Sequence, residues 1–329
     1  MIFINKTAPC PKELPNVQVS DTTEDDSSNA DGQQKNNMNY KVIHTTTYTY
    51  DKAMSLCHNI ARLMPRNTDS QICKDSVVKV NPHPDTISEY EDFFGNKVVY
   101  FAIQQEHKTL TVTVTSEITK IPANAGGINL YINTPWQHVI EQLYKSKEAY
   151  IDVIQYIPET HITTASREIE AYALQSYTPG RSMFEATKDL MHRIYADFKF
   201  ESGFTTIATP LSEVMKQRKG VCQDFAHLAI ACVRSVGLPA RYVSGYLETI
   251  PPKGAEKLVG VDASHAWFAV YIPNAGWIDF DPTNNQLPSA QHITIGWGRD
   301  YADISPLKGI ILSSGRHQLA VSVDVRRTL

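Results

Sequence analysis

The sequence predicts an α+β protein in which a small β-sandwich precedes a module of helices packed on an antiparallel sheet. From about residue 39 to 120, short segments alternate apolar and polar residues with period two, as strands do. From about residue 161, apolar residues recur every three or four positions, as in amphipathic helices, and the alternating pattern returns after residue 237. The chain has 329 residues, which is enough for two domains of this kind.

The bulk composition is that of an ordinary globular protein, with 42% hydrophobic and 20% charged residues. The formal net charge of −4 offers no clustered basic excess for nucleic acid. No run of about 18 apolar residues is present to form a transmembrane helix. The first ten residues lack both the basic leader and the apolar stretch of a signal peptide. We therefore expect a cytoplasmic protein that binds neither nucleic acid nor membrane.

Changes in composition suggest the domain limits. Residues 1–37 are polar and acidic and are predicted to be a disordered tail, because they have too few apolar side chains to offset the entropy of ordering. Residues 38–120 are predicted to form the β-sandwich, with FFGNK as a hairpin turn. Residues 121–160 form a connector. Residues 161–329 are predicted to form the second domain, which ends in a predicted hairpin about the SSG at 313–315.

Helices and then strands are predicted in the second domain. Apolar spacing predicts helices over residues 166–177 and 182–198. A short helix in PLSEVMKQRKG ends at Gly220, and a longer apolar helix in VCQDFAHLAIACVRSVG ends at Gly237. Strands follow in ARYVSGYL, SHAWFAVYI and GWIDFDP, and the turn cluster PNAG joins the last two.

The cysteines are few and form no pattern. An odd number without a CxxC pair argues against both a disulfide framework and a structural zinc site, so we expect no metal and no cofactor. The ordinary role of such a cysteine is that of a small buried apolar residue. The five are Cys10, Cys57, Cys73, Cys222 and Cys232.

Cys222 differs from the others in its position, since it follows Gly220 and lies in the first turn of the predicted apolar helix. Unpaired N–H groups and the helix dipole favour negative charge there, which predicts a depressed pKa for its thiol. The thiolate is the form that attacks carbonyl groups. Cys232 lies ten residues further along the same helix and is predicted to be buried and inert.

Two other residues can complete a catalytic arrangement with Cys222. His265 opens one predicted strand and Asp281 ends the next. The tight turn between these strands makes them antiparallel neighbours, so both side chains can lie at one edge of the sheet facing the start of the helix. A nucleophile, a base and a carboxylate that orients the base would then be assembled. Spacing alone leaves a purely structural role open for each, and Asp279 competes with Asp281 because it lies on the same strand face.

Other residues near these positions are assigned supporting roles. His227 is five positions from Cys222, which turns it about 140° around a helix and makes direct pairing poor. We therefore predict structural roles for His227 and for Asp224. Trp267 and Trp277 are predicted to pack around the site. The histidines of the first domain have no ligand spacing and are predicted to lie on the surface: His44, His58, His83 and His107.

Three sequence blocks together resemble the transglutaminase-like superfamily: RKGVCQDFAHL, VSGY and SHAWFAVYIPNAGWIDFDPTNN. The similarity is closest to the bacterial and archaeal branch whose members are described as cysteine proteases, and it includes the β domain of that branch at residues 39–120. The resemblance implies a papain-like core with the cysteine on a helix packed against an antiparallel sheet. It implies Cys222 as nucleophile, His265 as base and Asp281, rather than Asp279, as the orienting carboxylate.

The acceptor of the acyl group decides the reaction. Attack on an amide or ester gives a thioester, which water resolves in a peptidase or amidase and an amine resolves in a transglutaminase. Calcium-dependent transglutaminases carry further C-terminal β domains, whereas residues 286–329 alone follow DPTNN, and no EF-hand-like loop is present. We predict hydrolysis of an amide bond in a peptide or protein, with the N–H of Cys222 in the oxyanion hole. Amine transfer and a non-catalytic binding module remain alternatives.

Overall fold

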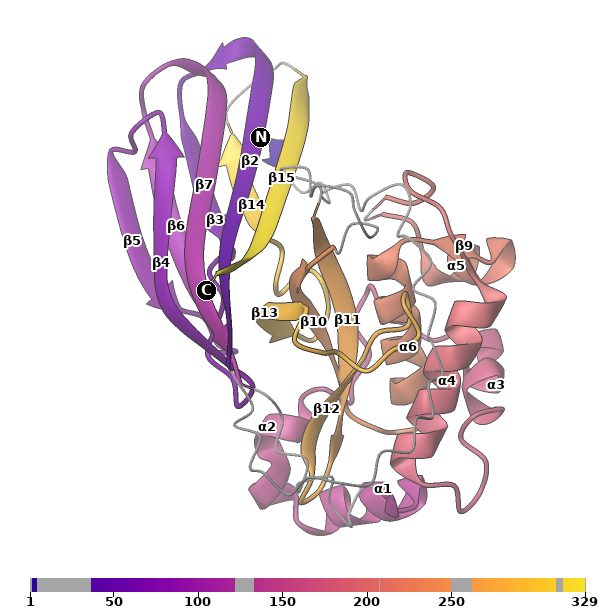
Figure 1. Ribbon diagram of the computed structural model, residues 1–329. Coiled ribbons are helices and arrows are strands. Elements are labelled where there is room, and N and C mark those ends of the chain that lie inside the picture. Colours follow the sequence, from indigo (N-terminus) through magenta and orange to yellow (C-terminus); the bar gives the residue numbers. More distant parts are fainter. Residues whose placement is uncertain are drawn as a thin grey trace, which may run out of the picture.

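The computed structural model describes residues 2–4, 37–121, 133–206, 208–249, 262–311 and 316–328. These residues form a β-sandwich and an α+β core, so the predicted fold class is confirmed. Figure 1 shows a four-stranded sheet in the middle of the molecule, with helices on one side of it and the sandwich on the other.

The sandwich consists of two antiparallel sheets with strand orders β1-β14-β3-β6-β5 and β15-β2-β7-β4. Along β2, buried side chains alternate with more exposed ones, as the period-two pattern predicts. The inward side chains of both sheets form one core, which includes Tyr48, Phe101 and Val112. The strands are β1 (Ile2–Ile4), β2 (Met38–Met54), β3 (Cys57–Ala61), β4 (Gln71–Asn81), β5 (Thr86–Glu91), β6 (Lys97–Ile103), β7 (His107–Lys120), β14 (Leu307–Ile311) and β15 (His317–Thr328).

The last two strands correct the predicted domain boundary. β15 pairs with β2 and β14 pairs with β3, so both belong to the sandwich and not to a catalytic domain that runs to residue 329. They lie in different sheets and therefore do not form a hairpin with each other. The SSG turn lies outside the described residues. Alternation identified the strands, but it specifies a buried face and not a partner strand.

Two further expectations for the sandwich are corrected. Ile2–Ile4 pairs with β14, so the predicted disordered tail does not include these three residues, and residues 5–36 lie outside the described part. His44 and His107 are buried and not on the surface, whereas His58 and His83 are exposed. Burial lowers the pKa of His44 to about 4.

The core contains an antiparallel sheet of order β12-β11-β10-β13. Its strands are β10 (Ala240–Leu247), β11 (Ala263–Ile272), β12 (Gly276–Phe280) and β13 (His292–Gly298). The helices are α1 (Trp136–Lys145), η2 (Lys147–Tyr150), α2 (Ile151–Ile154), α3 (Arg167–Leu174), α4 (Met183–Asp197), α5 (Leu211–Gln217) and α6 (Cys222–Ser235). Short parallel strands β8 (Lys199–Phe200) and β9 (Lys219–Gly220) precede α5 and α6. In the described parts of the chain, no helix is long and apolar enough to cross a membrane.

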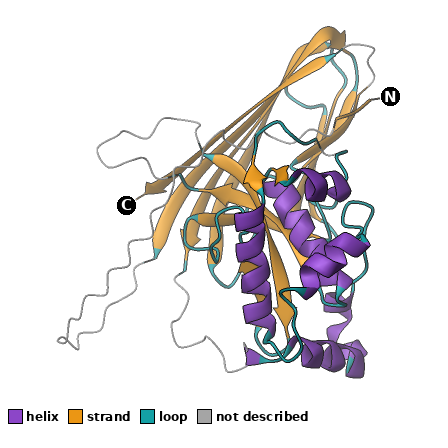
Figure 2. Ribbon diagram, turned by 90° about the vertical axis from the view of Figure 1, so that its right-hand side faces the viewer, coloured by secondary structure: helices purple, strands orange, loops and turns teal. Residues whose placement is uncertain are grey.

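Helix α6 is the centre of the core. It is buried from Cys222 to Arg234, with β10 and β11 on one side and α3, α4 and α5 around it. Figure 2 shows the helices in front of the sheet. Two helices around it begin as the sequence predicts, since the side chains of Ser166 and Ser182 accept N–H bonds at the starts of α3 and α4.

The sandwich covers the other face of the core sheet through apolar side chains and two amides. Tyr246 and Ile293 of the core pack against Val42 of the sandwich. The Gln71 side chain donates to the Thr294 carbonyl (2.8 Å) and accepts from the Thr294 N–H (3.0 Å). Asn96 makes the equivalent pair with the backbone of Trp297 (2.8 and 3.0 Å). These amides satisfy the edge of β13 as a neighbouring strand would, which fixes the sheet against the sandwich.

Candidate active site

Cys222 is the first residue of α6, and the turn before it is held by Asp224. The Asp224 carboxylate accepts the N–H of Val221 (2.8 Å) and the hydroxyl of Thr205, and so caps the helix. A Cβ at Gly220 would lie 2.9 Å from the Asp224 carboxylate, so only glycine fits there. The motif GVCQD therefore builds a helix start that presents the thiol, and Asp224 has the predicted structural role.

His265 lies on β11 opposite Gly245 of β10. A Cβ at Gly245 would meet the Ile293 carbonyl at 2.3 Å and the Trp267 ring at 2.4 Å. The missing side chain therefore lets the Trp267 indole lie across β10, where its ring centroid is 6.0 Å from that of His265. Trp267 is 1% exposed, in agreement with the predicted packing role.

The structure brings Cys222, His265 and Asp281 together. His265 Nε2 lies 2.8 Å from Asp281 Oδ2, and a hydrogen bond joins the ring to the Cys222 side chain. Because Nε2 is used by Asp281, Nδ1 is the ring nitrogen left for the thiol. All three side chains are buried, with residue exposures of 6%, 3% and 0%.

Asp281 is the centre of a larger hydrogen-bonded group. Its Oδ2 also accepts from His292 Nε2 (3.0 Å) and Asn284 Nδ2 (2.7 Å). Its Oδ1 accepts the N–H groups of Thr283 (3.0 Å) and Asn284 (3.3 Å). Five donors thus converge on one buried carboxylate, which keeps it ionised and fixes its orientation.

The electrostatics favour a charged His265. Burial opposes charge on the imidazole, but the charge and hydrogen bond of Asp281, followed by those of Cys222, raise the pKa of His265 to about 10. Burial also opposes charge on Asp281, yet its two histidine neighbours hold the pKa of this carboxyl far below its usual range. An imidazolium beside Cys222 favours the thiolate, which is the reactive form of cysteine.

His292 and Asn284 are site residues that the sequence reasoning missed. Burial lowers the pKa of His292, so its ring is neutral. Its Nδ1 accepts the N–H of Ser289 (3.3 Å), which assigns the proton to Nε2, the atom that donates to Asp281. A signal was present in each case, because His292 opens an alternating strand as His265 does, and Asn284 belongs to DPTNN.

His265, Asp281 and His292 are residue types that can bind a metal ion. Ligand atoms of His265, Asp281 and His292 lie within 4.8 Å of one another. Both imidazole Nε2 atoms, however, donate to one carboxylate oxygen at 2.8 and 3.0 Å, so their protons occupy the direction in which a cation would have to bind. We interpret the cluster as a hydrogen-bonded support for the base, and independence of metal stays a prediction.

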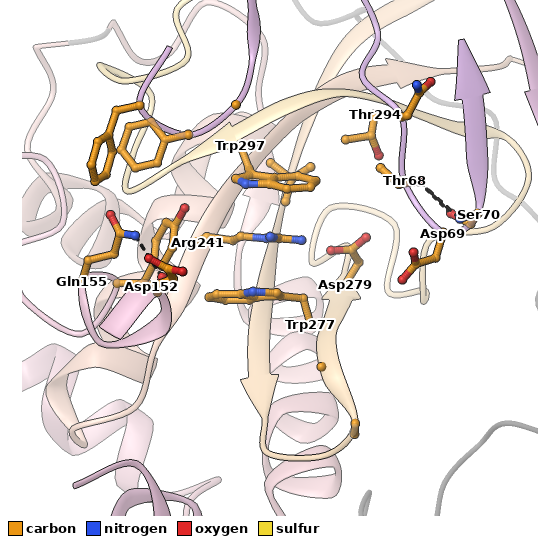
Figure 3. Close-up of a pocket in the computed structure, with 18 residues that line it drawn as sticks. Thr68, Asp69, Ser70, Asp152, Gln155, Arg241, Trp277, Asp279, Thr294 and Trp297 are labelled. Carbon is orange, nitrogen blue, oxygen red and sulfur yellow. Dashed lines mark hydrogen bonds between the residues drawn. The ribbon is translucent and has the colours of Figure 1, made fainter. Parts of the chain in front are cut away.

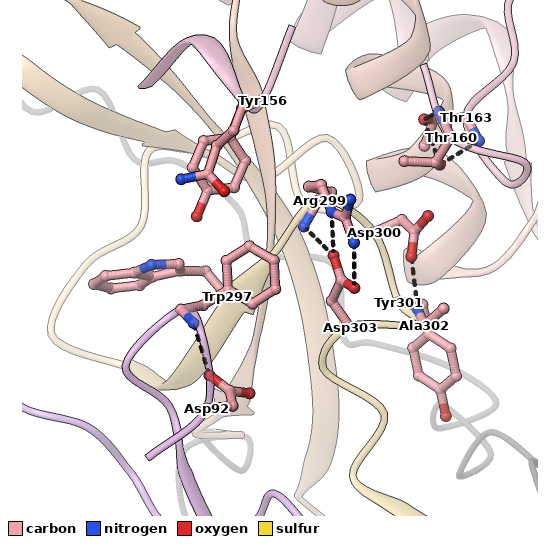
Figure 4. A network of polar contacts seen from close by, with 12 residues as sticks. Asp92, Tyr156, Thr160, Thr163, Trp297, Arg299, Asp300, Tyr301, Ala302 and Asp303 are labelled. Carbon is pink, nitrogen blue, oxygen red and sulfur yellow. Dashed lines mark hydrogen bonds and ion pairs between the residues drawn. The ribbon is translucent and has the colours of Figure 1, made fainter. Parts of the chain in front are cut away.

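Asp279 and His227, the alternatives to Asp281 and His265, have other contacts. In the described part of the chain, no hydrogen bond joins Asp279 to His265. His227 accepts the N–H of Tyr301 (3.1 Å) and stacks on Tyr242 at 4.8 Å, and burial lowers its pKa to about 3. Bonds from Arg299 to Asp303 and from the Ala302 N–H to Asp300 hold the loop that carries Tyr301 (Figure 4). His227 therefore anchors this loop, as its predicted structural role requires.

Comparison with known proteins identifies the family. Residues 40–119 match the model of the bacterial transglutaminase-like N-terminal region, and residues 170–282 match the transglutaminase-like superfamily. An uncharacterized protein of Mycobacterium bovis is 41% identical over 295 residues, which cover 87% of this chain and 92% of that protein. The chain belongs to the transglutaminase-like superfamily.

Two further proteins are similar to this chain, one in fold and one in a short segment of sequence. A crystal structure named as a putative cysteine protease from Cytophaga hutchinsonii has a TM-score of 0.68 at 24% identity and covers 89% of this chain and 91% of its own. That likeness confirms the fold of both domains. A protein-glutamine gamma-glutamyltransferase of Pseudomonas aeruginosa is 36% identical over 72 residues, which cover 22% of this chain and 11% of that protein.

Limiting iodoacetamide at neutral pH is expected to alkylate Cys222 first, because its thiol is hydrogen-bonded to His265, an imidazole whose pKa is raised by Asp281. Burial raises the pKa of Cys57 and Cys73, and raises that of Cys232 to about 12. Peptide mapping by mass spectrometry after partial reaction gives the order. Cys73 is the demanding comparison, because it is more exposed than Cys222. Earlier labelling of Cys73 or Cys232 would contradict the assignment, and His265→Ala should slow the reaction at Cys222 alone.

Proposed function

We propose that this protein is a cysteine-dependent hydrolase that cleaves an amide bond in a peptide or protein, with Cys222, His265 and Asp281 as its catalytic residues. One observation carries the proposal. The Cys222 thiol at the start of α6 is hydrogen-bonded to an imidazole whose other nitrogen is held by Asp281 at 2.8 Å. This is the relation of nucleophile, base and orienting group that acyl transfer requires.

The first half of the reaction forms a thioester. The Cys222 thiolate attacks the carbonyl carbon, and the resulting oxyanion lies near the N–H groups of the first turn of α6, which include that of Cys222. The C–N bond then breaks. The His265 imidazolium gives its proton to the leaving amine, so the amine departs neutral and the acyl group remains on sulfur.

The second half of the reaction hydrolyses the thioester and regenerates the free enzyme. Neutral His265 takes a proton from water as the water attacks the thioester, and the C–S bond breaks to release a carboxylic acid. Asp281 remains ionised throughout and stabilises the imidazolium each time it forms. The five donors around Asp281 support this role, because they keep its charge and position constant while His265 changes protonation state.

Amine transfer is the second candidate, and the segment shared with the gamma-glutamyltransferase favours it. The thioester step is the same in both reactions. A primary amine then replaces water as the attacking group, His265 removes its proton, and the product is a new amide. The two functions therefore differ only in the acceptor that reaches the thioester.

A substrate screen separates these reactions. Peptides, including glutamine-containing ones, are incubated with the enzyme with and without a primary amine, and products are identified by mass spectrometry. We expect a mass gain of one water across the cleaved bond and no amine adduct, in the presence or absence of EDTA. Amine adducts as the main product would establish transfer instead. Loss of activity in EDTA with rescue by calcium would contradict metal independence, and Cys222→Ala gives the background.

A further inference from the structure

A cavity of about 920 Å³ lies between the sandwich and the core sheet (Figure 3). The turn at 67–70 and the hairpin at 93–95 line it from the sandwich, and Trp277, Arg241 and Trp297 line it from the core. None of the three catalytic residues is part of its lining. Its volume is within the range of ligand sites in proteins.

Trp267 separates this cavity from the catalytic residues. Its ring packs against His265 and His292 on one side, and Trp277 and Trp297 belong to the same apolar cluster on the other. Because Trp267 is buried, a ligand in the cavity would not reach Cys222. The cavity is therefore a candidate binding site distinct from the thiol.

Arg241 is the most unusual group in the lining. Its guanidinium lies between the rings of Trp297 (3.7 Å) and Trp277 (4.3 Å), as Figure 3 shows. The residue is only 8% exposed, and its buried Nε has no hydrogen-bond partner. In the described part of the chain, no ion pair or hydrogen bond satisfies this guanidinium. The charge of Asp279 acts on this guanidinium and partly offsets the cost of its burial. Because Arg241 Nε and Asp279 Oδ1 both lack a hydrogen-bond partner, the arrangement still indicates a site prepared for a ligand with complementary charged groups.

The geometry also indicates which anion fits. The two indoles cover the flat faces of the guanidinium, and its end lies toward Asp279, which lines the same cavity (Figure 3). That end presents N–H groups in a planar fork, which matches the two oxygens of a carboxylate. Arg66 stacks on the far side of Trp297 at 3.4 Å and holds the arrangement in place.

The remaining charges in the lining are negative. Asp69, Asp152 and Asp279 face the cavity together with the single Arg241, and Asp279 Oδ1 is buried without a hydrogen-bond partner. A ligand that carried only negative charge would meet three carboxylates, so the site favours a ligand with a carboxylate and a cationic group. Phe93 at the rim is 81% exposed and offers an apolar surface beside these charges.

We propose that this cavity binds the C-terminal end of a peptide that carries a basic side chain. The terminal carboxylate pairs with Arg241, the basic side chain pairs with Asp279, and apolar side chains contact the indoles and Phe93. Binding of this kind does not require turnover at Cys222, so the proposal stands or falls separately from the hydrolase activity.

The test uses three acetylated tetrapeptides and the full-length Cys222→Ala protein, which cannot consume them. The first is Ala-Phe-Lys-Ala with a free C-terminal carboxylate, the second is its C-terminal amide, and the third has norleucine in place of lysine. Isothermal titration calorimetry measures affinity, and tryptophan emission reports contact with Trp277 and Trp297. We expect the amide to bind about tenfold or more weakly than the acid, and norleucine to weaken binding severalfold, because each removes one charge pair.

Variants locate the site. Arg241→Lys keeps the charge but loses the fork, and should abolish the preference for acid over amide. Arg299→Lys is the matched control, because Arg299 pairs with Asp303 outside the lining. If Arg241→Lys fails to fold by circular dichroism, Asp279→Asn serves instead and should remove the preference for lysine alone. Equal binding of acid and amide, absence of binding at millimolar peptide, or loss of binding after alkylation of Cys222 in the wild-type protein would overturn the proposal.

Discussion

Replacing Asp281 with asparagine is expected to lower the turnover number roughly 10³–10⁴-fold, by analogy with other triads. The carboxylate that raises the pKa of His265 to about 10 would be gone, so the imidazolium beside Cys222 would be less favoured. The rate of Cys222 alkylation at neutral pH should fall for the same reason. Both quantities can be measured on the same preparation, as initial rates of hydrolysis and of iodoacetamide labelling.

The same substitution is expected to destabilise the fold. Oδ2 accepts three donors and Oδ1 accepts two, so an amide NH₂ in either position meets donors with no acceptor for its own protons. Each buried unsatisfied group costs about 1–3 kcal/mol. Because the pKa of Asp281 is depressed in the folded state, its contribution is present above the unfolded value of about 3.9 and is lost as the pH falls. Urea unfolding should therefore give a lower free energy of unfolding for Asp281→Asn than for the wild-type protein at pH 7, and this difference should become smaller in acid.

Asp279→Asn is the comparison that decides between the two aspartates. Asp279 faces the cavity between the domains, so its replacement should change turnover far less than Asp281→Asn does. If Asp279→Asn lowers turnover strongly and Asp281→Asn leaves it nearly normal, then Asp279 and not Asp281 is the carboxylate that orients His265. If both enzymes are nearly normal, Cys222 and His265 act as a dyad.

Cys222→Ala is expected to reduce hydrolysis to background, a loss on the order of 10⁶-fold when a nucleophile is removed. The substitution also makes a prediction that needs no substrate. The hydrogen bond and charge of Cys222 contribute to the raised pKa of His265, so removing the thiol should lower that pKa below its wild-type value.

Nuclear magnetic resonance titration of the His265 ring gives this pKa directly, in protein labelled with ¹⁵N in histidine. Cys232→Ala is the matched control, because Cys232 is fully buried ten residues further along α6 and is not among the groups that shift His265. An unchanged His265 titration in Cys222→Ala would show that the thiol and imidazole do not interact, and would leave the proposed mechanism without its first step.

The local elements of the fold could be predicted because their signals are local. Period-two alternation identified β2, β7 and β11, and apolar residues at three- and four-residue spacing identified α3 and α4. Partners across the chain could not be predicted in this way. β15 has the same alternation as any half-buried strand, and only the packed structure places it beside β2 rather than in the core sheet.

The site also contains residues that could be predicted from the sequence and residues that could not. Cys222, His265 and Asp281 lie in motifs of adjacent residues, and the tight turn between β11 and β12 brings the last two together. His292 comes from β13, which reaches Asp281 only because β13 pairs with β10 on the far side of the sheet. The alternation after His292 indicates a strand, but it does not show which strand β13 pairs with, so it could not place His292 beside Asp281.

By itself, the sequence determined the family, many of the helices and strands, and the three residues proposed for catalysis, because each depends on neighbours a few positions away. The tertiary structure alone decided the second histidine on Asp281, the return of the C-terminal strands to the sandwich, and the cavity with its unpaired Arg241. These features join residues far apart in the chain, as when Gln71 completes the edge of β13 at Thr294, 223 residues away. Such contacts form only when two domains pack, since their energy comes from shape and burial that no short segment of sequence encodes.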